Sequence, residues 1–393
     1  MNSIGNTYQK NILLLQGPVG FFFKKLDKIF RSKGANTYRI GLNAGDEFFS
    51  YKDNYTGYKG KPKDWESFMV SYLKDHRIDK VFLFGDCRFY QSVIVKVAMA
   101  LHIEVFVFEE GYIRPHYITL EKDGVNEYSH ISRRPEFYQK IKLIDLPTPK
   151  SVTPNPVYNW SIVIIYYFVA RLLAFKYPYY RHHRNFSAME EFFFGIRSLL
   201  RKVIYTHRDK KLLPVIENEL SKQYFFVPLQ TYNDFQILQH SGYGSIEKFI
   251  IEVLESFAYQ ANEKDLLMFK HHPIDRGRKN YKKFILQQAE ELSITKRIII
   301  VHDLHLPTCL AHTKGTITIN STVGLSSILK GIPTITLGRA IYNIEGLTNK
   351  HLNLDEFWTK CTQPDQDFVL KFRQYIIETT QLNGNFFGRM PDL

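Results

Sequence analysis

Two adjacent carboxylates, Glu109 and Glu110, follow the apolar stretch Ile103 to Phe108 and lead into a glycine turn. The stretch is typical of a buried strand, and open α/β sheets hold their chemistry at the carboxyl ends of such strands. Because side chains alternate along a strand, only one of the two carboxylates can lie on a given face. Partial burial beside a like charge raises a carboxyl pKa, which suits a general acid or base. The alternative is a structural ion pair with Arg114 that shapes the loop.

Other polar residues follow two more predicted strands in this part of the chain. Gln16 and Gly17 lie in a turn that opens a helix, where backbone N–H groups can bind an anion, although the turn could also serve packing alone. Asp86 and Arg88 follow another strand; a guanidinium can grip a carboxylate or phosphate, whereas Asp86 could instead cap the next helix. The residues that we expect to line an acceptor site are Gln16, Gly17, Asp86, Arg88, Tyr112 and Arg114.

Three polar motifs in the second half of the chain also follow predicted strands. The hydroxyls and N–H groups of residues 320–324 could bind a phosphate at a helix start, or simply form a Ser/Thr cap. His272, held by Pro273, could donate to a phosphate or a leaving group, or lie in a polar surface turn. Asp234, in a polar loop, could be a nucleophile or base, or a turn residue.

The elements that must position these residues alternate between strands and helices. The predicted strands cover residues 10–16, 37–41, 80–84, 103–108, 224–229, 266–271, 297–301, 315–319 and 334–337. The predicted helices cover residues 22–31, 65–76, 90–101, 245–263, 278–292 and 322–330. This alternation predicts parallel sheets, and we expect two Rossmann-like domains facing a cleft, as in GT-B glycosyltransferases. The expected boundaries are 1–147, a helical aromatic and basic insert at 148–222 that could dock at the membrane interface, and 223–393.

The composition narrows the class of partner. The chain has 393 residues, a formal charge of +13 and an aromatic share of 15%, which together indicate a globular protein with anionic partners. Its three cysteines, Cys87, Cys309 and Cys361, lack the spacing of a zinc site or a disulfide framework, so we expect no metal and a reducing compartment. Charge alone favours nucleic acid, but no recognition motif supports that class. The polar N-terminus gives no secretory signal.

An aromatic and apolar run at residues 160–175 comes nearest to a membrane segment. It is interrupted by Arg171 and is short of the roughly 18–20 residues that a span needs. A basic and aromatic stretch, 176–184, follows it. The run therefore predicts either a buried helix or a helix lying in the membrane interface.

Several of these motifs together resemble a known family. They are residues 13–20 (LLLQGPVG), 84–88 (FGDCR), 108–115 (FEEGYIRP), 118–121 (ITLE), Gly124-Val125-Asn126 and 228–230 (PLQ) with Asp234 and Gln236. The set resembles the capsule polysaccharide biosynthesis and export family of Gram-negative bacteria, especially its KpsS-type members. The His-Pro pair at 272–273 and the Ser/Thr run at 321–327 are similar to donor motifs of KpsC-type enzymes and bacterial sialyltransferases.

The resemblance implies a retaining β-Kdo glycosyltransferase that is independent of cofactors and metals. Such an enzyme would transfer the acidic sugar Kdo from CMP-Kdo to (lyso)phosphatidylglycerol and so start the poly-Kdo linker of a capsule. By this likeness Asp234 is the nucleophile and Glu110 the acid or base, with Glu109 as its rival. The residues expected to bind the CMP group are Gln230, His272, Pro273, Ser321, Thr322, Gly324 and Ser326. His116 stands where the family is expected to have Asp, which puts the acceptor in question.

The same resemblance predicts the surroundings of the protein. We expect it in the cytoplasm, associated peripherally with the inner membrane through residues 157–184 and an anionic phospholipid, and working with capsule assembly proteins such as a KpsC-type transferase. Two other functions stay open at this point. One is a capsule transferase for another CMP-sugar, and the other is a non-catalytic export or assembly scaffold.

Overall fold

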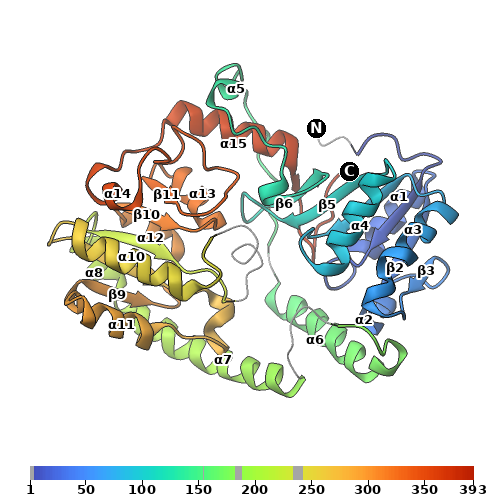
Figure 1. The fold of residues 1–393 in the computed structure, drawn as a ribbon, viewed down its shortest axis with the longest axis horizontal. Helices are drawn as coiled ribbons and strands as arrows, with labels where there is room; N and C mark the ends of the chain where they lie inside the picture. The colour runs from blue at the N-terminus through green and yellow to red at the C-terminus, as the bar shows by residue number, and fades with distance from the viewer. Residues whose placement is uncertain (1–3, 154, 182–187, 233–241) are drawn as a thin grey trace. The chain divides into compact units, whose positions relative to one another are not determined.

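The computed structural model, drawn in Figure 1, describes residues 4–153, 155–181, 188–232 and 242–393. Contacts between Cα atoms divide the chain into two compact units. Unit 1 comprises Met1–His130, Asp145–Asn185 and Tyr375–Leu393, and unit 2 comprises Ile131–Ile144 and Phe186–Gln374. The segment 148–222 thus contributes to both units, and the domain boundaries expected from the sequence stay a prediction.

Unit 1 is built on a seven-stranded sheet in the order β12-β6-β5-β4-β1-β2-β3. Its strands are β1 (Asn11–Leu15), β2 (Asn36–Gly41), β3 (Tyr55–Gly57), β4 (Lys80–Phe84), β5 (Glu104–Glu110), β6 (Tyr117–Lys122) and β12 (Gln381–Asn383). Strands β1 to β5 run parallel, whereas β6 pairs antiparallel with both β5 and β12. The chain leaves β1 first toward β2 and β3 and later toward β4 and β5, so the topological switch lies between β1 and β4.

Helices cover both faces of this sheet because successive side chains of a strand point to opposite faces. Leu13 and Leu15 pack with α3 and α4, whereas Ile12 and Leu14 pack with α1. The helices of unit 1 are α1 (Phe22–Ser32), α2 (Ala44–Phe48), α3 (Trp65–Asp75), α4 (Phe89–Ala100) and α6 (Pro156–Leu172), with short turns η1 (Pro62–Asp64), η2 (Asn126–Tyr128) and η3 (Ala174–Lys176).

Unit 2 contains a five-stranded sheet in the order β11-β10-β7-β8-β9, and every pair in it is parallel. Its strands are β7 (Tyr224–Pro228), β8 (Leu266–Lys270), β9 (Ile298–Val301), β10 (Gly315–Thr318) and β11 (Thr334–Thr336). The chain leaves β7 first toward β8 and β9 and later toward β10 and β11, so this sheet switches between β7 and β10.

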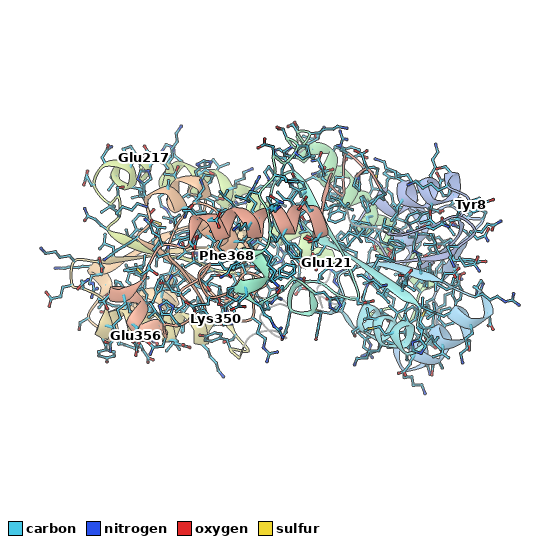
Figure 2. All side chains as sticks on the ribbon, turned by 90° about the horizontal axis from the view of Figure 1, so that it is seen from above. Tyr8, Glu121, Glu217, Lys350, Glu356 and Phe368 are labelled. Atoms are coloured by element: carbon cyan, nitrogen blue, oxygen red, sulfur yellow. The ribbon has the colours of Figure 1, made fainter. Side chains whose placement is uncertain are left out.

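The unit 2 sheet is also enclosed on both faces. Phe225 and Val227 of β7 pack with α10, α11 and α14, whereas Tyr224 and Phe226 pack with α8 and α12. The helices of unit 2 are α5 (Pro135–Gln139), α7 (Ala188–Lys210), α8 (Leu213–Asn218), α10 (Ile246–Gln260), α11 (Lys282–Glu291), α12 (Leu306–His312), α13 (Thr322–Ile328), α14 (Leu354–Lys360) and the first part of α15 (Gln366–Thr380), with turns η4 (Pro273–Gly277) and η5 (Thr295–Arg297). Phe368 of α15, labelled in Figure 2, lies 5.2 Å from the ring of Tyr138.

The predicted α/β class, with Rossmann-like parallel strands in each unit, is confirmed. Each predicted strand is present with its ends shifted by at most two residues; β5, for example, runs to Glu110 rather than Phe108. Apolar runs between turn residues therefore located these nine strands, whereas β3, β6 and β12 were not predicted. Among the helices of the described ranges, none is long and apolar enough to cross a membrane.

The C-terminal strand of unit 1 anchors the loop that follows β5. The Gln381 side-chain Oε1 accepts hydrogen bonds from the backbone N–H groups of Tyr112 at 3.0 Å and Ile113 at 3.3 Å. Its Nε2 donates to the hydroxyls of Thr119 and Thr380, each at 3.0 Å. One buried amide thus binds the backbone of the loop, a side chain of the neighbouring strand β6 and the last residue of α15.

Replacing this amide should therefore destabilise unit 1. The substitution Gln381→Ala leaves two buried N–H groups without an acceptor, and we expect it to lower the free energy of unfolding by about 2–4 kcal/mol. Ser71→Ala, at an exposed position of α3, is the control and should change it by less than about 0.5 kcal/mol. Denaturant titration measures both, and equal effects would contradict the anchoring role.

Candidate functional site

Four of the predicted residues lie at the carboxyl edge of the unit 1 sheet. Gln16 directly follows β1, Asp86 and Arg88 follow β4, and Glu109 is the penultimate residue of β5. Because β1, β4 and β5 are adjacent and parallel, their carboxyl ends meet at one edge. This edge includes the switch between β1 and β4, the position at which α/β sheets bind ligands.

Glu109 and Glu110 have different surroundings. Glu109 is half-buried and its Oε1 accepts a hydrogen bond from the Glu110 N–H at 3.0 Å, whereas the side chain of Glu110 is exposed. Burial raises the pKa of Glu109 to about 7, although the backbone hydrogen bond and the charge of Arg88 act against the shift. A carboxyl group with a pKa near neutrality can exchange a proton with a substrate. The geometry therefore favours Glu109 over Glu110 as the acid or base. That Glu109 has this catalytic role stays a prediction.

Asp86 connects two loops at this edge. Its Oδ2 accepts a hydrogen bond from the Val125 N–H at 2.9 Å, and its Oδ1 accepts one from the Cys87 Sγ at 3.0 Å. The residue that precedes α4 is Arg88, and its side chain makes no capping bond. The alternative that Asp86 caps the next helix is therefore wrong. The Arg88 guanidinium lies 5.7 Å above the ring of Phe84, within electrostatic range of Glu109.

The other predicted acceptor residues have structural contacts. Tyr112 is buried, donates its hydroxyl to Glu121 Oε1 at 2.6 Å, and accepts from the Asn126 N–H at 2.7 Å. Glu121, labelled in Figure 2, therefore fixes this ring within unit 1. The side chain of Arg114 is exposed and donates through Nε to the Gly111 carbonyl at 3.2 Å.

Gly17 has a packing reason to be glycine. A Cβ atom at this position would lie 2.5 Å from the ring of Phe23, which is closer than such contacts allow. The turn after β1 can therefore pack tightly on α1, as the simpler interpretation of this turn requires. Its role in anion binding stays a prediction.

Asp46 is a buried carboxylate that the sequence interpretation missed. Its Oδ2 accepts hydrogen bonds from the Leu42 N–H at 2.8 Å and the Gln16 Nε2 at 3.0 Å, and its Oδ1 accepts one from the Tyr166 hydroxyl at 2.7 Å. Burial raises its pKa, while these hydrogen bonds act to lower it. Gln16 in turn accepts from Gln91 Nε2 at 3.1 Å, so its amide is held within unit 1. The residues Asn43, Asp46 and Glu47, shortly after the end of β2, were the available signal.

Tyr166 belongs to α6, which packs beside α2 (Figure 1). A Cβ atom at Gly45 would lie 2.8 Å from the Tyr166 ring, and one at Gly20 would lie 2.7 Å from Ile162. Ile162 and Tyr166 are buried, whereas much of the rest of the helix is exposed. The exposed apolar residues of this segment are Val157, Tyr158, Trp160, Ile164, Ile165, Tyr167, Phe168, Leu172 and Phe175. α6 thus has a buried face and an exposed apolar face, and its place at a membrane interface stays a prediction.

In unit 2, an amide pair marks the switch between β7 and β10. The Gln230 Nε2 donates to Asn320 Oδ1 at 2.9 Å, and its Oε1 accepts from the Asn320 N–H at 3.3 Å. The two strand ends are therefore joined at the point where a ligand is expected. Gln230, predicted from the sequence to contact the donor, is 7% exposed, so its amide is largely committed to this pairing.

The remaining predicted donor residues lie at the same edge. His272 precedes η4, and its Nδ1 accepts from the Ile274 N–H at 3.2 Å, while Pro273 is exposed. Ser321 caps α13 by accepting from the Val323 N–H at 3.2 Å, as the simpler interpretation expected. Thr322 begins α13, and Ser326 donates back to its carbonyl at 3.3 Å.

Two further features qualify the predicted donor set. Gly324 is required by close packing, because a Cβ atom there would lie 2.3 Å from the Tyr342 hydroxyl. Asp234, the predicted nucleophile, lies outside the described residues, so its position is not part of the geometry. The binding roles of the donor residues stay predictions.

A stacked pair of histidines at this edge was also missed. His271 and His302 follow β8 and β9, and their rings are parallel with centroids 4.1 Å apart. The His271 Nε2 accepts from the Tyr281 N–H at 2.9 Å, and His302 Nδ1 lies 2.9 Å from the Arg208 Nη2. Burial lowers the pKa of His271 to about 4, so the ring is neutral at physiological pH. Within the described ranges, no group of three or more His, Cys, Asp or Glu side chains is placed to hold a metal ion.

Comparison with known proteins assigns this arrangement to a family. Residues 79–387 match the family model described as "Capsule polysaccharide biosynthesis protein", so the chain belongs to that family. The chain is 37% identical to the capsule polysaccharide export protein KpsS of Escherichia coli over 96% of its length and 97% of that protein. It is 36% identical to the capsule polysaccharide modification protein LipB of Neisseria meningitidis, over 97% and 92% of the two chains. The resemblance to this family inferred from sequence motifs is confirmed.

The similar solved structures have lower sequence identity to this chain than these two relatives have. The Thermosulfurimonas dismutans KpsC β-Kdo 2,7 transferase is 14% identical, with a TM-score of 0.41 over 92% of this chain and 89% of that one. A glycosyltransferase from Rickettsia africae is 10% identical, with a TM-score of 0.36 over 94% and 89%.

The raised pKa of Glu109 makes a prediction about stability. Its pKa is about 7 in the folded protein against an ordinary value of 4.5, so the folded state binds the proton more tightly than the unfolded state. The free energy of unfolding should therefore fall as the pH rises between these two values. Glu109→Gln removes the ionisable group and therefore the loss of stability that its ionisation causes. The substitution should raise the melting temperature at about pH 8 and change it little near pH 4.

Glu110→Gln is the matched control because the neighbouring side chain is exposed. We expect its melting temperature to follow that of the unsubstituted protein across the same pH range. A parallel pH dependence for Glu109→Gln and the unsubstituted protein would show that Glu109 is not a strained carboxylate.

Proposed function

We propose that this protein is a retaining glycosyltransferase that transfers Kdo from CMP-Kdo to the glycerol of (lyso)phosphatidylglycerol in capsule biosynthesis. Its family membership supports a role in capsule assembly. The observation that carries a catalytic role is Glu109, a half-buried carboxyl with a raised pKa at the carboxyl edge of a parallel sheet. A protein that only binds polysaccharide has no need of such a group, because burying it lowers stability at neutral pH.

The first step concerns the donor, which we assign to unit 2. The Asp234 carboxylate attacks the anomeric carbon of Kdo, the bond from that carbon to the phosphate oxygen breaks, and CMP leaves with the electron pair. CMP is a stable anion, so its departure needs no proton. His272, Ser321 and Thr322 would stabilise its phosphate, while the pairing of Gln230 with Asn320 fixes the strand ends that hold them.

The second step concerns the acceptor, which we assign to unit 1. A glycerol hydroxyl attacks the anomeric carbon, its proton passes to Glu109, and Asp234 leaves as a carboxylate. Two inversions give net retention. Arg88 lowers the cost of keeping Glu109 ionised and can also bind an anionic acceptor. Glu109 therefore acts as a base, and its pKa near 7 suits this role at neutral pH.

The acceptor in this proposal is a lipid, so the protein must reach a membrane surface. The exposed apolar face of α6 carries Trp160 and Phe168, residues of the kind that lie at membrane interfaces. On the buried face of α6, the Tyr166 hydroxyl donates a hydrogen bond to Asp46, which also accepts one from the side chain of Gln16. We therefore assign α6 as a membrane dock that places unit 1 beside the lipid headgroups.

The proposal is tested by product mass and kinetics. The purified protein is incubated with a fluorescent lysophosphatidylglycerol, Kdo, CTP and a CMP-Kdo synthetase, and we expect one added Kdo by mass spectrometry. Glu109→Gln should lower kcat by about 10²–10⁴-fold, whereas Glu110→Gln should leave it nearly unchanged. In the unsubstituted protein, kcat should fall as the pH drops below about 7, because protonated Glu109 cannot accept a proton. Asp234→Ala should abolish transfer.

Each alternative has a distinct result. Transfer only to an acceptor that already carries Kdo would make the protein an elongating enzyme. Transfer from CMP-sialic acid but not CMP-Kdo would replace the donor. No transfer from any CMP-sugar, with normal lipid binding, would favour an assembly scaffold. Equal kinetic losses in Glu109→Gln and Glu110→Gln would contradict the assignment of the base.

A further inference from the structure

Helix α7 (Ala188–Lys210) has its polar and apolar faces reversed relative to an ordinary surface helix. Its arginines face unit 2: the Arg201 Nη1 donates to the Arg276 carbonyl at 3.0 Å, and Arg197 donates through Nε to the Gly277 carbonyl. The contact with η4 is close, because a Cβ atom at Gly277 would lie 2.2 Å from the Phe194 carbonyl oxygen. The polar face is therefore the one buried against unit 2.

The apolar side chains of α7 lie on the face that is exposed. Leu199 is 65% exposed, Val203 is 72% exposed and Ile204 is 60% exposed. Ile196 and Leu200 complete the face at helical spacing, and both are exposed. Isolated exposed apolar residues are normal, but a continuous row along a helix indicates a surface that is covered by a partner.

The charge around this face identifies the partner. Residues 193–211 contain six Lys or Arg side chains, of which the three arginines contact groups of unit 2 and the three lysines are exposed. The one acidic side chain in this range, Asp209, is buried. Lys202 and Lys210 are exposed on the same helix, and Lys211 follows it. An apolar face with flanking lysines fits the interface of a bilayer that contains anionic lipids, since the face enters the acyl boundary and the ammonium groups stay with the headgroups.

We propose that the exposed face of α7, formed by Ile196, Leu199, Leu200, Val203 and Ile204, lies on an anionic lipid surface. α7 belongs to unit 2, whereas α6 belongs to unit 1, so each unit has a membrane-binding helix of its own. This inference goes beyond the proposed function and holds whichever sugar is transferred.

α7 also contacts residues at the carboxyl edge of the unit 2 sheet. Asp209 Oδ2 accepts from the N–H groups of His302 at 2.6 Å and Asp303 at 2.8 Å. The Tyr205 ring lies 4.0 Å from the ring of His302, between centroids. α7 therefore holds the residues that follow β9 as well as η4, which begins directly after His272. A helix fixed on the membrane would hold this edge near the lipid headgroups.

The test measures binding to lipid vesicles without any sugar donor. We expect the protein to sediment with phosphatidylcholine vesicles that contain phosphatidylglycerol and much less with vesicles of phosphatidylcholine alone. The double substitution Leu199→Gln/Val203→Gln should weaken binding to the anionic vesicles about tenfold or more. Lys202→Glu/Lys210→Glu should weaken it by reversing charge while leaving the apolar face intact. Hydrogen exchange with bound vesicles should locate the protected amides in α7.

The matched control is Tyr259→Gln/Leu370→Gln, which removes two exposed apolar side chains of unit 2 from other helices. We expect this variant to bind vesicles like the unsubstituted protein, and circular dichroism checks that all variants fold. Unchanged vesicle binding in Leu199→Gln/Val203→Gln would overturn the proposal. Loss of self-association in that variant, with vesicle binding retained, would also overturn it and would assign the face to a second copy of the chain. Failure of the transfer assay would leave this result unaffected.

Discussion

The structure depends on a constraint that acts at the carboxyl edge of each parallel sheet. The strands bury apolar side chains on both faces, so the loops that leave them must carry the polar groups. In unit 1 this edge gathers Gln16, Asp86, Arg88 and Glu109, and in unit 2 it gathers Gln230, Asn320 and the paired histidines. At the two switches the chain departs in opposite directions, which leaves room for a ligand.

Placing polar groups at this edge lowers stability through Glu109. Partial burial raises its pKa to about 7, and a carboxylate held in this way lowers stability at neutral pH. Asp46, another buried carboxyl of unit 1, also has its pKa raised by burial, but the three hydrogen bonds that it accepts act against the shift. The raised pKa of Glu109, together with its half-buried position at the carboxyl edge of the sheet, is the physical basis for assigning proton transfer to it in our proposal.

Much of the fold could be predicted from the sequence because apolar runs bounded by turn residues are a strong signal for buried strands. The strand ends in turn located most of the candidate residues. The sequence could not decide between Glu109 and Glu110, since alternation separates their faces without saying which face is buried. The answer comes from long-range contacts, such as the packing of β5 between β4 and β6.

Other features depended on contacts that the sequence does not encode locally. His271 and His302 stack because the register of β8 and β9 pairs Lys270 with Val301, which brings the next two residues together. Asp46 was missed because its partner Tyr166 lies 120 residues further along the chain. α7 was identified as aromatic, basic and helical, but its orientation follows from the carbonyl groups of η4, which bind the arginines.

The central claim is that Glu109 holds a proton more tightly than an ordinary carboxyl group. Carbon NMR of protein labelled at the glutamate carboxyl carbons measures this directly, with the resonance assigned by its absence from Glu109→Gln. We predict that the Glu109 resonance titrates with a pKa of about 7. A resonance that titrates near 4.5, the ordinary value, would contradict the account, because Glu109 would then be no different from an exposed carboxylate.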